Sequence, residues 1–407
     1  MPTEQPASQT TRGSNRRNVT RRVFLEPVWR LPASYQTMLA FPPEGYEYVQ
    51  ANSVQENLFK ALSGRNISYT VLRAIDELVP TSLLKAWSQR RRRPPSGTSL
   101  TYAHHHLVLR NEPWVVETEY AGLLLGDRVH HISRFRHHVE EALSSTYFRG
   151  IRCWSEAARR TLVEGCSSAG FKEKVEVIPH AVPLRRFVKE LRSGGIKLLF
   201  VGSGNIAGQF YVKGGNYLLD TFQLVRQRFP EAELVIRSDM PAPALRRANQ
   251  TPGVKVLHRM VPWDELEREY LSADVFLLPS HTTPPFTILD AMSYELPVVS
   301  LDVWANGEYV ADGKTGLLAR PPKAVPYYYK GTSHPNFGSR EFGRAVSKCH
   351  PEVVKDLAGK IGLLIENPET RRAMGRAARW EVEHGRFSIA RRNEQLTAFF
   401  DKALGAS

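Results

Sequence analysis

Apolar residues in the second half of the chain form short continuous runs that alternate with runs of helical spacing. Residues 196–203, IKLLFVGS, have the continuous apolar character of a strand that is covered on both faces. Residues 214–230 place apolar side chains at positions 218, 219, 222 and 225, which is the spacing of one helix face. The alternation continues through the strand-like runs AELVIRS, VKVLHRM, DVFLLPS and PVVSLD and the helix-like runs PWDELEREYLSA and FTILDAMSYE. This order predicts a parallel α/β sheet with helices on both faces.

The first half of the chain shows the same alternation less regularly. Its strand-like runs are RRVFLEPVW, YEYVQA, SLTYAHHHL, PWVVETEYA, GIRCWS and KVEVIPHAV, and its helix-like runs are QENLFKALSG and ISRFRHHVEEALSSTY. Residues 67–78 fit a strand or a helix equally well. Ser155 is expected to cap a helix over residues 156–165, and Gly165 stands where that helix would stop.

These patterns predict two Rossmann-like domains that face a central cleft. We expect a disordered basic tail over residues 1–20, an N-terminal domain over 21–185 and a C-terminal domain over 195–385, joined by the charged linker PLRRFVKELRSGG. Two helices, PETRRAMGRAARWEVE and SIARRNEQLTAFFDKAL, end the chain, and segment 386–407 is expected to pack back on the N-terminal domain. Residues 324–343 look like an insertion. Folds of this class bind ligands at the carboxyl ends of their strands, and therefore in the cleft.

Composition narrows the class of protein. The 407 residues are 42% hydrophobic and 24% charged, which is typical of a globular protein with more than one core. The sequence has no run of 18 or more apolar residues, and its N-terminus lacks the apolar core of a signal peptide, so we expect a cytoplasmic location. Cys153, Cys166 and Cys349 have neither metal-like nor redox-motif spacing, and we expect them to be reduced.

The chain is strongly basic, with a formal net charge of +14 at pH 7. This charge predicts attraction to phosphate-bearing partners without naming one. Much of the excess lies in residues 12–22 and in the four arginines 90–93. Both clusters fit solvated tails and loop edges, and they fit equally a basic surface that holds a peripheral protein against anionic lipid headgroups at the inner membrane face. No helix-turn-helix, zinc-ligand spacing or aromatic ribonucleoprotein motif supports nucleic acid as a specific partner.

Several short motifs in residues 196–320 occur in an order that resembles the C-terminal domain of family-4 (group 1) retaining glycosyltransferases with the GT-B fold. These motifs are LLFVGSG, KGGNYLLDTF, FPEAELVI, YLSADVFLLPS, ILDAMSYELPVVSLD and GEYVADGKTGLLA. Weaker similarity lies at IRCWSEAARRTL and VEVIPHAVP. The resemblance implies an N-terminal domain that binds an acceptor and a C-terminal domain that binds a nucleoside-diphosphate sugar. It implies no required cofactor or metal.

The resemblance implies a donor diphosphate site in the loop after the first strand of the C-terminal domain. Lys213 stands where the family uses a lysine on the diphosphate, and a solvated loop lysine is the alternative. The preceding loop contains Gly202, Ser203 and Gly204, and Ser203 replaces the family's usual basic residue. Arg259, at the end of a later strand, could supply some of the missing charge.

The family's signature of two acids separated by seven residues falls on Thr282 and Asp290. Asp290 matches the acid that accepts hydrogen bonds from ribose hydroxyls, whereas Thr282 replaces the acid that contacts the donor sugar. Phe286, Thr287 and Ile288 would present free N–H groups at a helix N-terminus, which attracts a diphosphate. The Thr287 hydroxyl would cap this helix or reach a phosphate.

Three further side chains complete the candidate site. His281 is a candidate beside the donor sugar, with an ordinary surface histidine as the alternative. Glu308 matches a family acid beside the nucleotide. Glu119 stands where the family often has a histidine at the reaction centre. A carboxylate there could orient an acceptor hydroxyl or stabilise positive charge at the anomeric carbon, and pairing with an arginine explains it equally well. Lys213, Glu119 and His281 are thus the catalytic candidates.

A metal site is not expected. His104, His105 and His106 are consecutive on a predicted strand, so their side chains alternate between its two faces and cannot form one metal-binding face.

Three functions fit these motifs. The first is a retaining glycosyltransferase that moves a sugar from a nucleoside-diphosphate sugar to a hydroxyl of a glycan or lipid-linked acceptor. The departures at Thr282, Ser203 and Glu119 leave open a second, a catalytically weak or inactive GT-B protein that binds sugar nucleotides or glycans. A nucleotide-sugar epimerase shares the architecture but fits the order of the motifs less well.

Overall fold

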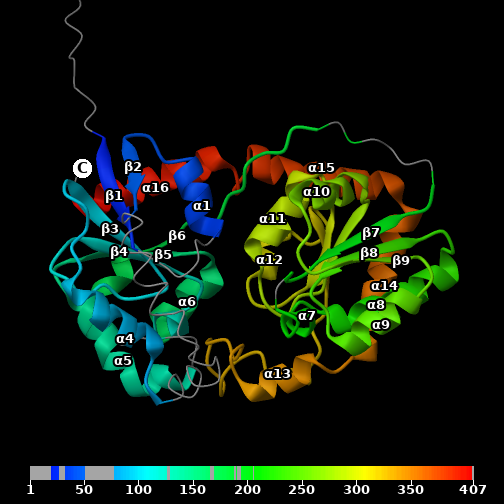
Figure 1. Cartoon of the computed structure of the whole chain (residues 1–407), viewed down its shortest axis with the longest axis horizontal. Coiled ribbons are helices and arrows are strands. Elements are labelled where there is room, and N and C mark those ends of the chain that lie inside the picture. Colours follow the sequence, from blue (N-terminus) through cyan, green and yellow to red (C-terminus); the bar gives the residue numbers. More distant parts are fainter. Residues whose placement is uncertain are drawn as a thin grey trace, which may run out of the picture.

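The computed structural model describes residues 20–26, 33–50, 78–125, 129–165, 169–187, 189, 194–204 and 206–405. The helix expected over residues 55–64, nearly all of the ambiguous segment 67–78 and the basic tail 1–19 lie outside the described residues. The described residues form two α/β domains that stand side by side (Figure 1).

The N-terminal domain is built on a parallel sheet of six strands. The strands are β1 (Arg21–Leu25), β2 (Tyr46–Val49), β3 (Thr98–His104), β4 (Trp114–Thr118), β5 (Phe148–Cys153) and β6 (Val175–Val177). They follow the order β2-β1-β3-β4-β5-β6. Among the described residues, its α-helices are α1 (Ala33–Ala40), α4 (Thr81–Ser88), α5 (Val129–Ser144) and α6 (Glu156–Gly165), and its 3-10 turns are η1 (Gln89–Arg91), η2 (Ala121–Leu125) and η3 (Ala169–Lys174). Each strand-like run that was predicted here contains an observed strand.

The C-terminal domain has a second parallel sheet of six strands, which confirms the prediction of two Rossmann-like units. The strands are β7 (Lys197–Val201), β8 (Glu233–Ser238), β9 (Val254–His258), β10 (Val275–Leu278), β11 (Val298–Leu301) and β12 (Gly316–Ala319), in the order β12-β11-β10-β7-β8-β9. All four side chains of β10 are fully buried, as its continuous apolar sequence predicts for a central strand that is covered on both faces.

Helices cover both faces of this second sheet (Figure 1). The described α-helices of this domain are α7 (Gln209–Val212), α8 (Gly215–Arg228), α9 (Ala242–Gln250), α10 (Trp263–Ser272), α11 (Pro285–Ser293), α12 (Asn306–Tyr309), α13 (Arg340–Val346), α14 (Pro351–Glu366) and α15 (Pro368–Glu383). The predicted helices α8, α10, α11 and α15 are present. Helices α9 and α14 lie where the sequence patterns above predicted none.

The last helix, α16 (Ile389–Leu404), crosses from the C-terminal domain to the N-terminal sheet (Figure 1). Phe399 and Phe400 join the hydrophobic core around β1 and β3, and Asp401 forms an ion pair with Arg21 at 2.6 Å. The close approach depends on Gly150 in β5, where a Cβ atom would lie 2.6 Å from the Phe399 ring. The first and last described elements therefore belong to the same domain.

The segment expected to be an insertion, residues 324–343, lies beneath the gap between the domains together with α13 (Figure 1). Phe342 and Val325 form a small core there. Its Phe337 ring contacts the Tyr120 ring of the N-terminal domain, with 6.2 Å between centroids. A side chain at Gly165, the end of α6, would collide with the His334 ring at 2.6 Å. The segment therefore packs against both domains.

Candidate functional site

The carboxyl ends of β7 and β10 form the edge of the C-terminal sheet where a ligand is expected. These two strands pair side by side at the point where the strand order reverses. Connections leave such a pair in opposite directions, which opens a crevice where doubly wound folds bind ligands. Gly214, after α7, touches the loop after β10: its φ is +79°, and a Cβ atom would lie 2.0 Å from the Pro279 oxygen. Only glycine combines this backbone angle with this contact.

The contact between these loops brings Lys213 and Thr282 together. The Lys213 Nζ donates a hydrogen bond to the Thr282 Oγ1 at 3.1 Å. Burial lowers the pKa of Lys213 to about 8, while the nearby Glu119 carboxylate acts in the opposite direction. Glu119 belongs to the N-terminal domain, so its charge acts on Lys213 across the cleft. The structure thus groups three of the predicted site residues.

The N-terminus of α11 lies at the same edge of the sheet, since the helix begins directly after the β10 loop. Its first helical hydrogen bond runs from the Ile288 N–H to the Pro284 oxygen at 3.2 Å. The prediction that Ile288 has a free amide was therefore wrong, whereas the amides of Phe286 and Thr287 precede this bond. Pro284 occupies the N-cap position, so Thr287 is not the helix cap. The α11 terminus keeps the positive end of its dipole.

Asp290 lies one turn further along α11, on the face that Phe286 shares. Its side chain is 24% exposed, and an Oδ1 lies 3.9 Å from the Arg185 Nη2. Burial raises the pKa of Asp290 to about 6, and the Arg185 charge opposes this rise. The guanidinium of Arg185 stacks on the Trp263 ring at 4.8 Å. Asp290 can therefore accept hydrogen bonds from a ligand that also contacts the α11 amides.

The loop of Gly202, Ser203 and Gly204 is tied to the next strand of the sheet. The Arg237 Nη1 donates to the Gly202 oxygen at 2.8 Å, and the Asp239 N–H donates to the Ser203 oxygen at 2.6 Å. A Cβ atom at Gly202 would lie 2.6 Å from the Ser238 Oγ, so this position also requires glycine. These bonds hold the loop at the carboxyl end of β7.

Arg259 lies at the edge of the sheet, beside an acid that contacts the loop after β7. It follows β9, the edge strand, and its Nε lies 3.6 Å from an Asp239 oxygen. The Asp239 N–H in turn donates to the Ser203 oxygen. The guanidinium is largely exposed, and its contribution to a diphosphate site stays a prediction.

The structure places His281 in the core instead of beside the cleft. Its side chain is fully buried, and its Nδ1 lies 2.7 Å from the Tyr327 hydroxyl of the 324–343 segment. Burial lowers the pKa of His281 to about 3, so the ring is neutral. The histidine therefore links the β10 loop to this segment, which differs from the predicted place beside a sugar.

Glu308, on α12, contacts the other domain. Its two carboxylate oxygens accept hydrogen bonds from the Glu156 N–H at 2.6 Å and the Ala157 N–H at 2.8 Å. These amides form the N-terminus of α6, whose N-cap Ser155 accepts from the Ala158 N–H at 3.0 Å, as predicted. In this structure Glu308 is thus engaged between the domains, and its place beside a nucleotide stays a prediction.

Sequence reasoning missed the most buried carboxylate of the N-terminal domain. Glu117, on β4, has no exposed surface. Its oxygens accept five hydrogen bonds, from Ser34 Oγ (2.8 Å), Tyr102 Oη (3.0 Å), His104 Nδ1 (2.7 Å), Arg152 Nη1 (3.1 Å) and Trp154 Nε1 (3.3 Å). Burial alone would raise the pKa of Glu117, but the His104 bond and the Arg152 charge hold it well below its usual range. A carboxylate inside an otherwise apolar strand was the available signal.

The three consecutive histidines have different environments. His104 faces Glu117, whereas His106 is buried and its Nδ1 lies 2.7 Å from the His104 oxygen. Among the described residues, no group of three or more histidine, cysteine or acidic side chains could hold a metal ion.

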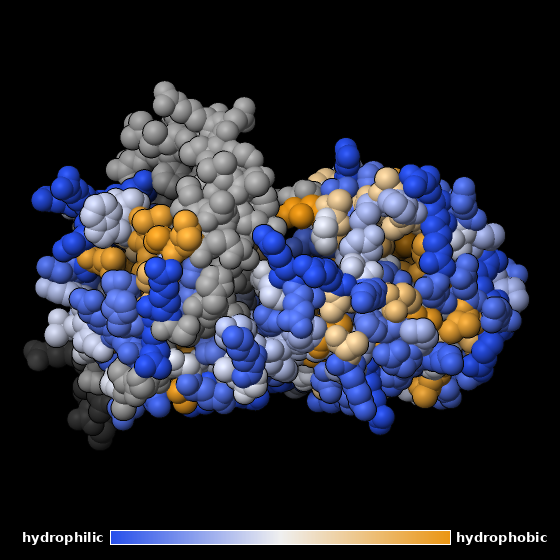
Figure 2. Space-filling view, turned by 90° about the horizontal axis from the view of Figure 1, so that it is seen from below, coloured by the Kyte–Doolittle hydropathy of each residue, from blue (hydrophilic) through white to orange (hydrophobic). Residues whose placement is uncertain are grey.

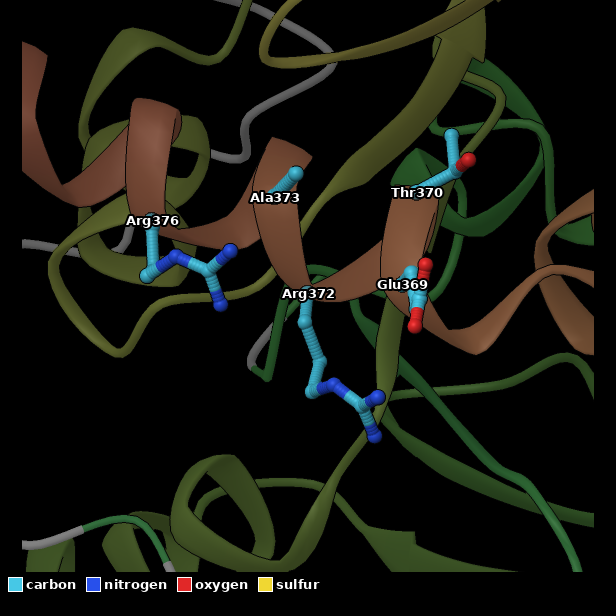
Figure 3. A pocket seen from close by; sticks show the side chains of 5 residues that line it. All are labelled: Glu369, Thr370, Arg372, Ala373 and Arg376. Atoms are coloured by element: carbon cyan, nitrogen blue, oxygen red, sulfur yellow. The ribbon is translucent and has the colours of Figure 1, made fainter.

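A separate hollow of about 550 Å³ lies along α15. Figure 3 shows Glu369, Arg372 and Arg376 extending from one side of this helix, with Thr370 and Ala373 on the other. None of the residues that line it belongs to the β7 and β10 crevice. Its arginines lie on one helix, and we assign this hollow no role.

The whole architecture matches that of known GT-B glycosyltransferases. Sucrose-phosphate synthase from Thermosynechococcus elongatus superposes with a TM-score of 0.60 at 16% identity, covering 95% of this chain and 100% of the other. HepE from Anabaena, in a complex with UDP and glucose, gives a TM-score of 0.57 at 14% identity over 94% and 99% of the two chains. At such identities the likeness shows the fold, so the protein has the two-domain GT-B fold.

The similarity to a known family lies in the C-terminal domain. Residues 195–328 match the family described as "Glycosyl transferases group 1", so this part of the C-terminal domain is similar to that family. Sulfoquinovosyl transferase SQD2 of Arabidopsis thaliana is 28% identical over 187 residues, which are 44% of this chain and 31% of that protein. The chain thus matches about a third of the length of this relative.

Proposed function

We propose that the protein is a retaining glycosyltransferase that moves a hexosyl group from a nucleoside-diphosphate sugar to a hydroxyl of a glycan or lipid-linked acceptor. One observation carries the proposal. Lys213, Thr282 and the N-terminus of α11 meet where the carboxyl ends of β7 and β10 diverge, with Asp290 one turn behind them. This arrangement offers a cation and helix amides for the diphosphate, and a carboxylate for the ribose, of a bound nucleoside diphosphate.

The chemistry assigned to each group follows from its charge. The Lys213 ammonium and the amides of Phe286 and Thr287 would stabilise the leaving diphosphate. Asp290 would accept the ribose hydroxyls. In the transfer, the bond between the anomeric carbon and the phosphate oxygen breaks, and a bond to the acceptor oxygen forms on the same face. The acceptor proton goes to the leaving phosphate, so no cofactor or metal is required.

The identity of the base is inferred from a neighbour. HepE of the same fold holds UDP, so UDP is the first nucleotide to test. Ser203 contributes no charge, so Lys213 would be the main side-chain cation at the diphosphate.

We propose that the protein acts at the cytoplasmic face of a membrane. Among the described residues, no helix has the length and apolar character required to cross a bilayer. Arg90, Arg91 and Arg93 are exposed, and Trp87 on the adjacent α4 is 69% exposed. Arginines beside an exposed tryptophan suit peripheral contact with anionic headgroups, where a lipid-linked acceptor would be reached.

The proposal predicts that Lys213→Ala weakens donor binding and transfer. Loss of a charge-assisted contact to phosphate costs about 1.5–3 kcal/mol, which corresponds to a UDP Kd about 10–100-fold higher. Isothermal titration with UDP and a transfer assay over a panel of UDP-sugars measure both effects. Lys355→Ala, at an exposed position of α14, is the matched control and should change neither.

The alternatives give different results in the same assay. UDP binding without transfer or hydrolysis of any donor would favour a binding protein that lacks activity. Interconversion of free UDP-sugars in the absence of an acceptor would indicate an epimerase. A Lys213→Ala variant that binds UDP and transfers sugar as the wild type does would remove the proposed site.

A further inference from the structure

The loop after β7 turns two successive carbonyl groups to the same side. The Gly202 oxygen accepts a hydrogen bond from the Arg237 Nη1 at 2.8 Å. The Ser203 oxygen accepts one from the Asp239 N–H at 2.6 Å and one from the Ser238 Oγ at 3.1 Å. All three donors belong to β8 or to the residue that follows it. Both carbonyl groups therefore point towards β8.

This orientation fixes the direction of two successive amides. In a planar trans peptide the N–H points opposite to the C=O of the preceding residue. The N–H groups of Ser203 and Gly204 therefore both point away from β8. Because β7 lies between β8 and β10 in the sheet, they point to the side of the β10 loop, which carries Thr282. Successive amides that point the same way form a nest, a backbone arrangement that binds phosphate and other anions.

The guanidinium of Arg237 packs against the opposite side of this loop. A Cβ atom at Gly204 would lie 3.0 Å from the Arg237 Cζ and 2.5 Å from the Met260 Sδ. The glycine thus allows the guanidinium to touch the loop backbone. The positive charge of Arg237 therefore lies behind the two amides, on the side of their carbonyl partners.

This charge is buried without an acidic partner. Arg237 is 9% exposed, and in the described part of the chain no ion pair joins it to an acid. Its Nε is buried and has no hydrogen-bond partner. Burial lowers the pKa of Arg237, and Tyr270 acts in the opposite direction. An unpaired buried charge destabilises a folded protein, so an anion bound nearby would offset this cost.

Arg237 is also close to the acid that would bind the ribose. Burial raises the pKa of Tyr270 well above its usual value, and Asp290 adds to this rise whereas Arg237 opposes it. Both charges therefore act on the same buried hydroxyl. The loop after β7 and Asp290 lie near enough to contact one nucleotide.

We propose that the amides of Ser203 and Gly204 bind a phosphate oxygen of the donor diphosphate, and that Arg237 is their positioning residue. Arg237 holds the Gly202 carbonyl away from the ligand, and from behind the loop it supplies the charge that the Ser203 side chain lacks. The inference rests on the proposed transferase function. It assigns a role to a residue of β8 that no sequence motif indicated.

Two substitutions at Arg237 separate this role from a structural one. Arg237→Met keeps a long side chain but removes the charge, and we expect it to raise the UDP Kd about tenfold. Its thermal unfolding without UDP should occur at the wild-type temperature or above, because an apolar side chain removes the cost of an unpaired buried charge. Arg237→Lys keeps the charge and should recover most of the affinity. Arg246→Met, at an exposed position of α9, is the matched control and should change neither quantity.

Isothermal titration and thermal unfolding of the full chain measure the two effects, with UDP or whichever of GDP, ADP and dTDP binds the wild type most tightly. An Arg237→Met variant with a Kd within twofold of wild type, or equal losses in both variants, would overturn the inference. An Arg237→Met variant that unfolds at a clearly lower temperature, or fails to fold, would assign Arg237 to the fold alone. The transferase proposal survives these outcomes, because it rests on Lys213 and α11. A wild type that binds none of the four nucleotides would overturn that proposal and this inference with it.

Discussion

Two ionisable residues of the candidate donor site have pKa values shifted by burial in opposite directions. Asp290 is raised to about 6 and Lys213 is lowered to about 8. Both shifts mean that the folded protein disfavours the charged form. For Asp290, stability falls as pH rises from about 4 to about 6, because the folded state binds the extra proton. For Lys213, stability rises with pH above about 8, because there the unfolded state binds more protons.

A bound nucleoside diphosphate needs both residues in their charged forms, so UDP affinity should be highest between about pH 6 and pH 8. Above pH 8 Lys213 loses its proton, and each further pH unit should weaken binding by up to about tenfold. Calorimetric titrations from pH 5 to pH 9.5 measure this profile. Lys213→Arg should remove the alkaline decline, because arginine stays protonated.

The expected fall of UDP affinity below about pH 6 requires a separate control, because the terminal phosphate of UDP also titrates near pH 6. Asp290→Asn should flatten the part of the decline that belongs to the protein and leave the part that belongs to UDP. Equal wild-type affinity at pH 7 and pH 9 would contradict the assignment of Lys213 to the diphosphate.

At the residue scale, sequence motifs indicated the site residues that follow the ends of strands. They did not indicate the buried side chains that contact one another across neighbouring strands. Lys213, Thr282 and Asp290 could be placed because motifs fix their positions after β7 and β10. Glu117 could not be distinguished from Glu119 in the same way, because all five side chains of β4 are buried and alternation carries no information there. Its partners include Ser34, 83 positions away in the chain, and no local pattern shows such a contact.

At the element scale, α12 of one domain caps α6 of the other. The N-terminus of α6 needs acceptors for its first amides. Ser155 satisfies one of them, and Glu308 satisfies two more from the C-terminal domain. Near Glu308, the Tyr309 hydroxyl donates to the Trp154 oxygen at 3.0 Å. These bonds join the domains near Trp154, whose ring lies 4.3 Å from the His180 ring.

Substitution of Glu308 distinguishes this contact from a nucleotide contact. Glu308→Gln removes a carboxylate from a helix N-terminus and should cost about 0.5–2 kcal/mol of stability. Thermal unfolding measures this loss, and titration with UDP should give a Kd within about twofold of wild type. Glu352→Gln, at an exposed position of α14, serves as the control. A large loss of UDP affinity with unchanged stability would support the nucleotide position that the family resemblance implied.

Helices α9 and α14 were not predicted from the sequence, for different reasons. Helix α9 has only a short apolar face, in which Ala244 and Leu245 are partly buried and Ala248 is fully buried. Helix α14 does carry such a stripe, at Val353, Val354, Leu357, Ile361 and Leu364. Periodicity alone would have predicted α14, whereas α9 forms because β8 and β9 require a connection between parallel strands.

At the scale of the whole molecule, several contacts among the described residues relate the two domains. They include the Glu308 cap on α6, the 324–343 segment against Tyr120 and α6, and α16 on the N-terminal sheet. The alternation of strands and helices was sufficient to predict two Rossmann-like domains. The contacts that join them were beyond such a prediction, because Glu308 and Glu156 are 152 positions apart.

Three exposed arginines lie next to an apolar surface of the N-terminal domain. Figure 2 shows a patch of hydrophobic residues among hydrophilic ones on this domain, on the side where α4 and α5 lie in Figure 1. The exposed apolar side chains of α4 include Leu84 and Trp87. Arg90, Arg91 and Arg93 follow directly and are exposed. This combination gives the membrane proposal a defined surface, the α4–η1 face.

Binding to lipid vesicles tests the α4–η1 face. Each arginine near an anionic surface contributes about 1 kcal/mol, so three of them predict roughly 100-fold preference for vesicles with phosphatidylglycerol over neutral phosphatidylcholine vesicles. Trp87→Ser should reduce cosedimentation with the anionic vesicles about tenfold, since insertion of a large apolar side chain contributes about 1.5–3 kcal/mol when complete. Trp380→Ser is the matched control, because Trp380 is 53% exposed on α15 of the other domain. Equal binding by the two variants, or wild-type binding that ignores lipid charge, would show that this face does not contact the membrane, and the acceptor would then have to be reached in solution.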